Sequence, residues 1–307
     1  MDRLAYWWFQ GQAELKVARL TETAFQDHFN DVMEAIHGSD FIRVRPAGNV
    51  GDRKCDGYLK PTDAVFQVYA PKRVVLKKWM DKVDEDFAGA KRQWASMRGW
   101  TFVHNDHDGL PADLTQQLLK LETDNPGLTI DHWSPQRLSL ATKDLAFEQL
   151  QPLFGNPPTD SDMRDLGRDD IAKAVAGLAL EGQSWVPGAA DLPAVDPRKI
   201  DFNRLTELPR RLLTAGMTQA QMVDDYFAHH PDPTLRDRAA LLMKVEWMRL
   251  QAQGVDGDDA FHALHDKAIR PFGGSRQMSA SLALLAFLFE SCDIFDNPPL
   301  GWPGAAA

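Results

Sequence analysis

The segment from Gly48 to Tyr58 holds the residues whose types and spacing best suit chemistry. It contains two carboxylates, Asp52 and Asp56, with Lys54 between them and a glycine on each side. Further along, Gln67 interrupts an apolar run. Carboxylate and amide oxygens are hard ligands for divalent cations, and a cation with one open coordination position activates water. The pattern therefore predicts a magnesium or manganese site that includes Asp56 and Gln67.

Two strands joined by a short turn would bring these ligands together. Tyr58 opens one strand candidate, and residues 65–69 form the next one after a Pro-Thr-Asp turn. If Asp56 lies at the end of the first strand and Gln67 lies midway along the second, the hairpin places both side chains at one edge of a sheet. The other interpretation is that Asp52 and Asp56 only shape turns before glycine, as aspartate does in most loops.

The flanking chain supplies the elements that such a hairpin needs. Apolar residues recur at helical spacing on both sides of it, and short apolar runs alternate with these helical segments. The expected elements are a helix from about Ala13 to His37, strands at Phe41–Arg45, Tyr58–Leu59 and Val65–Tyr69, a helix over Val74–Met97, a strand at Trp100–His104, a helix over Leu114–Leu121, a strand at Leu128–Trp133 and a helix from Pro135 towards Leu145. This order predicts an α/β domain, a mixed sheet with helices on both faces.

The character of the chain changes after Leu153. The turn-rich stretch 155–160 has no strand pattern after it, and the later apolar segments recur at helical spacing between Gly and Pro residues. We therefore expect an α/β domain over residues 1–153, a linker over 154–159 and an all-α domain over 160–307. In the second domain, residues 282–289 are apolar almost all round, which predicts either the central helix of a bundle or a helix docked on a partner.

The composition of the chain indicates its cellular compartment and limits the kinds of partner that it can bind. The formal net charge of −10 argues against a general nucleic-acid coat, because duplex affinity comes mainly from Lys and Arg at phosphates. The two cysteines, Cys55 and Cys292, follow no metal-ligand spacing. The apolar runs end well before membrane-spanning length. We therefore expect a reduced, cytoplasmic protein without membrane contact.

A local basic run interrupts this acidic chain just after the hairpin. It begins with Lys72, Arg73, Lys77 and Lys78 and continues to Arg98. One interpretation is a solvated helix face. The other is a rim that binds nucleic-acid phosphates beside the proposed metal.

The histidines are assigned ordinary roles. His104 and the polar residues up to Asp108 follow a strand and precede a glycine, as turn residues do. His262 and His265 lie three apart on an expected helix and could share a ligand. Without a neighbouring carboxylate pair, they are predicted to lie on the surface.

The order helix, strand, Asp-bearing strand, strand with a central polar residue, helix resembles the PD-(D/E)XK, or restriction-endonuclease-like, nuclease superfamily. The resemblance covers roughly residues 13–145. It implies that an Asp and a Glu or Gln hold magnesium, and that a nearby Lys positions or activates water. Asp56 matches the Asp position and Gln67 matches the Glu or Gln position. Phe25-Gln26 resembles a Phe-Glu pair that gives some members a further ligand, so Gln26 is a candidate metal ligand beside Asp52.

The chain departs from that pattern in two ways. Tyr69 stands where the lysine is expected, and glutamine replaces glutamate at Gln67. An amide oxygen is a weaker magnesium ligand than a carboxylate, so the site carries less negative charge. Lys54 and Lys72 are the candidates for the missing lysine; Lys54 ranks first because it lies in the turn that presents the aspartates.

Two longer strings extend the resemblance to a particular group. The run from Gly48 to Tyr58, followed by Phe-Gln-Val-Tyr-Ala-Pro, resembles the nuclease-like domain of prokaryotic anti-phage effectors, including those of three-component systems with an ABC-type ATPase. The segment Phe289–Pro299 looks like the C-terminal motif of the same group. The resemblance implies a defence-system DNA endonuclease whose helical domain binds a protein partner, such as that ATPase, or a second copy of the chain. The alternative is a nuclease-fold adaptor without catalytic activity.

Overall fold

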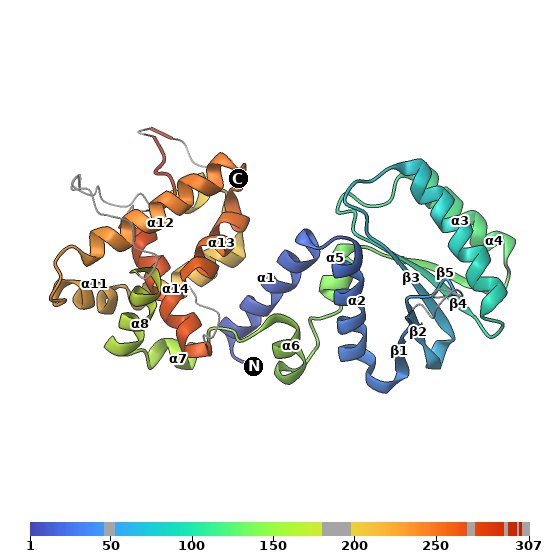
Figure 1. Cartoon of the computed structure of the whole chain (residues 1–307), viewed down its shortest axis with the longest axis horizontal. Helices are drawn as coiled ribbons and strands as arrows, with labels where there is room; N and C mark the ends of the chain where they lie inside the picture. The colour runs from blue at the N-terminus through green and yellow to red at the C-terminus, as the bar shows by residue number, and fades with distance from the viewer. Residues whose placement is uncertain (46–52, 180–197, 269–273, 292–293, 300, 303–307) are drawn as a thin grey trace. The chain divides into compact units, whose positions relative to one another are not determined.

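The computed structural model describes residues 1–45, 53–179, 198–268, 274–291, 294–299 and 301–302. The chain forms two compact units (Figure 1). We call Gln12–Gly155 the sheet unit, and Met1–Gly11 together with Asn156–Ala307 the helical unit. The first helix, α1 (Arg3–Arg19), begins in the helical unit and continues beyond Gly11. Asp52, one of the expected metal ligands, lies outside the described residues.

The sheet unit follows the expected order of elements. These are α2 (Glu22–His37), β1 (Phe41–Arg43), β2 (Gly57–Leu59), β3 (Ala64–Tyr69), α3 (Leu76–Gln93), β4 (Gly99–His104), α4 (Ala112–Asp124), β5 (Thr129–Trp133), α5 (Pro135–Leu140) and α6 (Phe147–Phe154). The expectation of a mixed sheet with flanking helices is confirmed at this level.

The helix expected from Ala13 to His37 is instead two helices, and this is a correction. α1 ends at Arg19 and α2 begins at Glu22. The break occurs where Glu22 adopts a left-handed backbone conformation, φ 53°. There its N–H donates to the carbonyl of Ala70 over 2.5 Å, which ties the start of α2 to the end of β3. Helical periodicity alone does not show this break, because the tether comes from a residue far along the chain.

The sheet has the strand order β1-β2-β3-β4-β5. The first three strands form an antiparallel meander, in which Gly57 of β2 lies opposite Phe66 of β3. β3, β4 and β5 run parallel, joined through α3 and α4. Parallel strands need such crossover helices, which cover the sheet and leave its strands apolar on both faces.

Aromatic side chains fill both faces of the sheet. On one face Phe29 of α2 packs against Phe66, with ring centroids 5.5 Å apart. On the other face, where α3 and α4 lie side by side (Figure 1), Trp79 packs against Phe102 at 5.8 Å. Because side chains alternate along a strand, Gln67 belongs to the same face as Tyr69, which packs against Trp79. The polar residue therefore lies in an otherwise apolar layer.

The described part of the helical unit contains helices and no strand. After the first residues of α1 come α7 (Asp160–Arg164), α8 (Arg168–Ala179), α9 (Lys199–Phe202), α10 (Glu207–Met217), α11 (Ala220–Ala228), α12 (Leu235–Ala252), α13 (Gly257–Ala268) and α14 (Ser275–Glu290). Every residue of α14 from Met278 to Phe289 is buried, which confirms the expected central helix of the bundle. No helix in the described residues has the length and apolar character to span a membrane.

The histidine pair on α13 corrects another expectation. His262 is 3% exposed and His265 is fully buried, whereas the sequence predicted a surface position. The ring of Trp8 lies 5.1 Å from that of His265 and covers it. Burial lowers the pKa of His265 to about 3. The i, i+3 spacing defines a helix face, but the residue that covers it comes from the other end of the chain.

We expect Gly216→Ala to destabilise the helical unit. A methyl group on Gly216 would lie 2.6 Å from the carbonyl oxygen of Leu282 on α14, a backbone atom that cannot move alone. The clash outweighs the better helix propensity of alanine, and the free energy of unfolding should fall by roughly 1–3 kcal/mol. Urea unfolding followed by circular dichroism measures this. Thr214→Ala, an exposed change two residues away on α10, is the control and should stay within about 0.5 kcal/mol; equal stability of the two variants would contradict the close helix contact.

Candidate functional site

Asp56 lies immediately before β2 and is almost fully buried, at 4% exposure. Its N–H donates to the carbonyl of Phe66 over 2.8 Å, and its carbonyl accepts from the N–H of Val44 over 3.1 Å. Before it, Arg53 and Lys54 both have left-handed backbone angles, φ 55° and 59°. After this turn, the backbone of Asp56 lies between β1 and β3, and its hydrogen bonds to Val44 and Phe66 fix its position.

The Asp56 carboxylate is shared between a helix and a strand. Its Oδ1 accepts a hydrogen bond from Nε2 of Gln26 on α2, and its Oδ2 accepts one from the N–H of Val68 on β3, each over 2.7 Å. The structure therefore brings together Asp56 and Gln26, two of the predicted metal ligands. A carboxylate has about four lone-pair sites, so these two hydrogen bonds orient the group and do not by themselves occupy all of the sites.

Gln67 lies across the hairpin from Asp56. The residues on both sides of Gln67 bind Asp56: the carbonyl of Phe66 accepts from its N–H, and the N–H of Val68 donates to its carboxylate. Gln67 is 3% exposed, and its Oε1 is buried without a hydrogen-bond partner in the described part of the chain. A buried acceptor left unpaired is unfavourable by about 1–3 kcal/mol. A cation is one partner that would remove this cost.

A metal here would have one carboxylate and several amide oxygens. Among the described residues, no group of three or more His, Cys, Asp and Glu side chains could hold a metal ion. The residues that fit one are Asp56, the unpaired Gln67 oxygen, and Gln26 after its amide turns to present Oε1. Hard amide oxygens suit Mg²⁺ or Mn²⁺, although the site is weaker than a pair of carboxylates.

Asn30 is a polar residue near the site that the sequence analysis did not select. It lies one turn after Gln26 on α2, is 1% exposed, and its Oδ1 is buried without a hydrogen-bond partner in the described chain. A Cβ on Gly57 would lie 3.5 Å from this oxygen. The sequence signal that could have identified Asn30 is the pair of amides at i and i+4 of one helix, because that spacing places them on one face.

The two candidate lysines have different surroundings. Lys54 pairs with Glu85 over 2.5 Å and with the fully buried Asp86 over 3.0 Å, both on α3. The hydrogen bond to Glu85 raises the pKa of Lys54, with Asp86 adding to it. Lys72 is 73% exposed and pairs with Glu22 over 3.2 Å. Glu22 lies one turn before Gln26 on α2, so Lys72 is near the side of the helix that contacts Asp56.

The basic residues after Lys72 are on the surface. Arg73, Lys77 and Lys78 are exposed and form no ion pair with any described residue. Lys77 and Lys78 lie in the first turn of α3, where the helix macrodipole already has its positive end. Cations do not stabilise a helix at that position, but together with the free N–H groups they attract phosphate. We call Lys72, Arg73, Lys77 and Lys78 the basic rim.

His104, at the end of β4, has a structural role. Its Nδ1 accepts from the N–H of Asp106 and its Nε2 lies 3.3 Å from Nδ1 of His132, so His104 carries its proton on Nε2. Burial is the main cause that lowers the pKa of His104 to about 3, with His132 and His107 contributing. Asp106 accepts from the N–H of Asp108, a turn hydrogen bond as expected. These contacts use both ring nitrogens.

We expect Asp56→Ala and Asp56→Asn to differ in stability. Alanine leaves the buried N–H of Val68 without an acceptor, which should lower the free energy of unfolding by about 1–3 kcal/mol. Asparagine keeps an oxygen for Val68, and a turned Gln26 amide can accept from its NH₂ group, so the loss should stay below about 1 kcal/mol. Urea unfolding of both variants tests this. Equal losses would mean that the charge of Asp56, rather than its acceptor capacity, stabilises the hairpin.

His104 should make the sheet unit less stable in mild acid. The unfolded histidine takes up a proton below its ordinary pKa of 6.5, whereas the folded one stays neutral down to about 3. Its stabilising effect is therefore complete above pH 6.5 and is lost progressively below, by about 2 kcal/mol between pH 7 and pH 5. His104→Phe should unfold in urea with a shallower pH dependence over this range. An unchanged slope would show that His104 is protonated in the folded protein.

One comparison with known proteins identifies part of the chain. Residues 169–296 match the family model for C-terminal domain 10 of the ABC-three component (ABC-3C) systems. No curated protein and no solved structure matches the chain. The match covers less than half of the sequence and lies wholly inside the helical unit. The helical unit thus carries a C-terminal domain of an ABC-three component defence system.

Proposed function

We propose that the chain is a metal-dependent DNA endonuclease effector of its defence system, controlled through the helical unit. The observation that carries the proposal is the hydrogen bond of Asp56 with Gln26, together with its bonds to Val68 and Phe66 on β3. The residue between these two on β3 is Gln67, whose buried oxygen has no partner in the described chain. These residues are the ones that the resemblance to PD-(D/E)XK nucleases selects. The order of α2, three antiparallel strands, α3 and a parallel strand supports a restriction-endonuclease-like fold for the sheet unit.

A bound Mg²⁺ or Mn²⁺ would supply a Lewis acid and lower the pKa of water for attack on a phosphodiester. The chain's own groups do the rest. Asp56 binds through a carboxylate whose orientation the Gln26 and Val68 hydrogen bonds fix. The basic rim holds the DNA backbone without reading bases. The substrate is thereby positioned at the edge of the hairpin.

We assign the water-orienting role to Lys72 rather than Lys54. Lys54 is held against α3 by two ion pairs, one of them to a fully buried carboxylate that would be left with less compensation if the lysine moved. Lys72 forms a single, exposed pair with Glu22, and such pairs contribute only about 0–1 kcal/mol. A phosphate can therefore draw Lys72 away from Glu22 at little cost.

The second candidate function is an adaptor that keeps the nuclease fold without its chemistry. Tyr69 favours it, because this residue occupies the lysine position and packs against Trp79 and Phe102. The single carboxylate among the described ligands favours it too. Both candidates give the helical unit a protein partner, such as an ABC-type ATPase.

Cleavage of plasmid and linear duplex DNA by the full chain separates the two functions. We expect cutting with Mg²⁺ or Mn²⁺ that chelator abolishes and that Asp56→Asn reduces by more than about 100-fold, beyond the 10–100-fold typical of outer-shell partners. Asp56→Asn is preferable to alanine because it preserves the acceptor for Val68. Asp113→Asn, an exposed carboxylate on α4, is the matched control and should cut normally.

A direct metal titration covers the case in which the isolated chain awaits a partner. Mn²⁺ binding, followed by electron paramagnetic resonance with the wild type, Asp56→Asn and Asp113→Asn, does not depend on turnover. If the wild type and Asp113→Asn bind Mn²⁺ and Asp56→Asn does not, the result supports the nuclease even when no DNA is cut. No binding and no cutting in the wild type would overturn the nuclease and leave the adaptor.

A further inference from the structure

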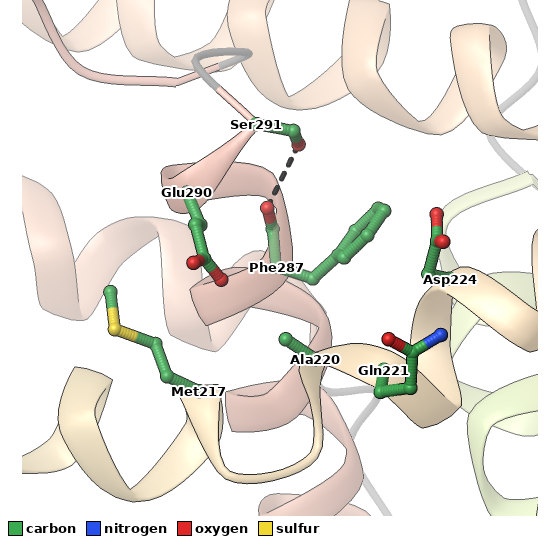
Figure 2. Close-up of a pocket in the computed structure, with 7 residues that line it drawn as sticks. All are labelled: Met217, Ala220, Gln221, Asp224, Phe287, Glu290 and Ser291. Atoms are coloured by element: carbon green, nitrogen blue, oxygen red, sulfur yellow. Dashed lines mark hydrogen bonds between the residues drawn. The ribbon is translucent and has the colours of Figure 1, made fainter. Parts of the chain in front are cut away.

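The two units differ in where they keep charged groups that the nuclease proposal does not use. In the helical unit, a recess of about 360 Å³ lies where α10 and α14 end (Figure 2). Its polar side chains in the described chain are exposed or bonded within the unit, as in the hydrogen bond that Ser291 donates to the carbonyl of Phe287 over 2.8 Å. The described lining of the recess therefore contains no buried charge, whereas the sheet unit does contain one.

That buried charge is the carboxylate of Asp86 on α3, which is fully buried among the apolar residues of the helix. One of its oxygens lies 3.0 Å from Nζ of Lys54, and the other lies 2.8 Å from Nζ of Lys82. Lys82 is one turn earlier on the same helix, whereas Lys54 belongs to the turn before β2. A buried carboxylate needs such compensation. The ion pair therefore ties α3 to the turn that precedes Asp56.

The aliphatic stem of Lys54 lies against α3 where the helix has no side chain. A Cβ on Gly89 would be only 2.5 Å from Cγ of Lys54, so the glycine leaves room for the stem. Lys54 also pairs with Glu85, but the Glu85 side chain is 66% exposed and solvent screens that pair. Asp86 is therefore the stronger of the two anchors for Lys54.

Trp94, directly after α3, contacts the chain on both sides of Asp56. Its Nε1 donates to the carbonyl of Arg53 over 3.2 Å, and its ring stacks on that of Tyr58 with centroids 5.1 Å apart. Arg53 and Lys54 both have left-handed backbone angles, which non-glycine residues keep only where surrounding contacts hold them. α3 and the residue after it supply these contacts.

We propose that Asp86 is a positioning residue for Asp56 and acts through Lys54. An apolar pair of similar volume is often as stable as a buried ion pair, so the charges are better explained by the arrangement that they select. The inference rests on the proposed function in one respect, that Asp56 binds the metal. When the Gln26 amide turns towards a metal, Val68 is the one of the two donors that still bonds the carboxylate, and the anchored turn limits its movement.

The test reads the orientation of Asp56 without metal or turnover. The full chain is labelled with ¹⁵N in its valines, and Val68→Ile assigns the amide signal of Val68, the donor to Asp56 Oδ2. A hydrogen bond to a charged oxygen is short and deshields its proton. In Asp86→Asn, which circular dichroism must show to be folded, we expect this signal to move upfield. Mn²⁺ affinity, followed by electron paramagnetic resonance, should fall by about 10-fold, the lower end of the range for outer-shell partners.

Matched variants separate positioning from a general effect of charge or stability. Asp84→Asn, an exposed carboxylate on the same helix, should leave the Val68 signal and the Mn²⁺ affinity unchanged. Lys54→Met is the milder variant should Asp86→Asn fail to fold, because it leaves Asp86 paired with Lys82. It should move the Val68 signal in the same direction as Asp86→Asn. Lys54→Arg keeps a cation and should restore both the signal and the affinity.

Three results would overturn the proposal. One is a Val68 signal and a Mn²⁺ affinity in folded Asp86→Asn that equal those of the wild type. Another is an equal change in Asp84→Asn. The third is a Lys54→Met variant that loses DNA cleavage while its Val68 signal stays in place, because Lys54 would then act on the substrate directly. If the wild type neither binds Mn²⁺ nor cuts, the nuclease fails, and a moved Val68 signal still supports the positioning role of Asp86.

Discussion

The sheet unit depends on one buried carboxylate. Asp56 accepts from Gln26 on α2 and from Val68 on β3, and its own backbone joins β1 to β3. One residue therefore fixes a helix, a hairpin and the candidate ligands relative to one another. A carboxylate at 4% exposure is tolerated only because donors surround it. The same donors set the direction in which its remaining lone pairs point, so the stability of the hairpin and the geometry of the site share a cause.

The sequence predicted well what local patterns determine. The hairpin, the parallel strands and the central helix α14 follow from apolar periodicity and turns, and the contact of Asp56 with the strand that carries Gln67 follows from the hairpin. Contacts between residues far apart in the sequence could not be predicted from local patterns. The break at Glu22 depends on the carbonyl of Ala70, and the burial of His265 depends on Trp8. The role of Gln26 came from a family resemblance, because its periodicity marked only a polar helix flank.

The local charge near the start of α3 is opposite in sign to the total of −10. The basic rim adds four cations near the start of α3, at the positive end of a helix. Within about 10 Å, the screening length at 0.1 M salt, local charge outweighs the net charge of the chain. In the proposed nuclease, the basic rim would therefore attract a phosphate backbone despite that net charge.

In the proposed nuclease, glutamine rather than glutamate at Gln67 would affect how activity is controlled. With one carboxylate, the described candidate ligands would place a single negative charge against a divalent cation, so metal affinity would be low before substrate arrives. A DNA phosphate supplies a second negative charge and further hard oxygens, and the basic rim brings that phosphate close. Metal and DNA would then bind cooperatively, each raising the affinity of the other by the same factor. In the proposed nuclease, the Gln67 amide therefore makes metal binding, and with it activity, depend on bound DNA. The adaptor needs no such coupling.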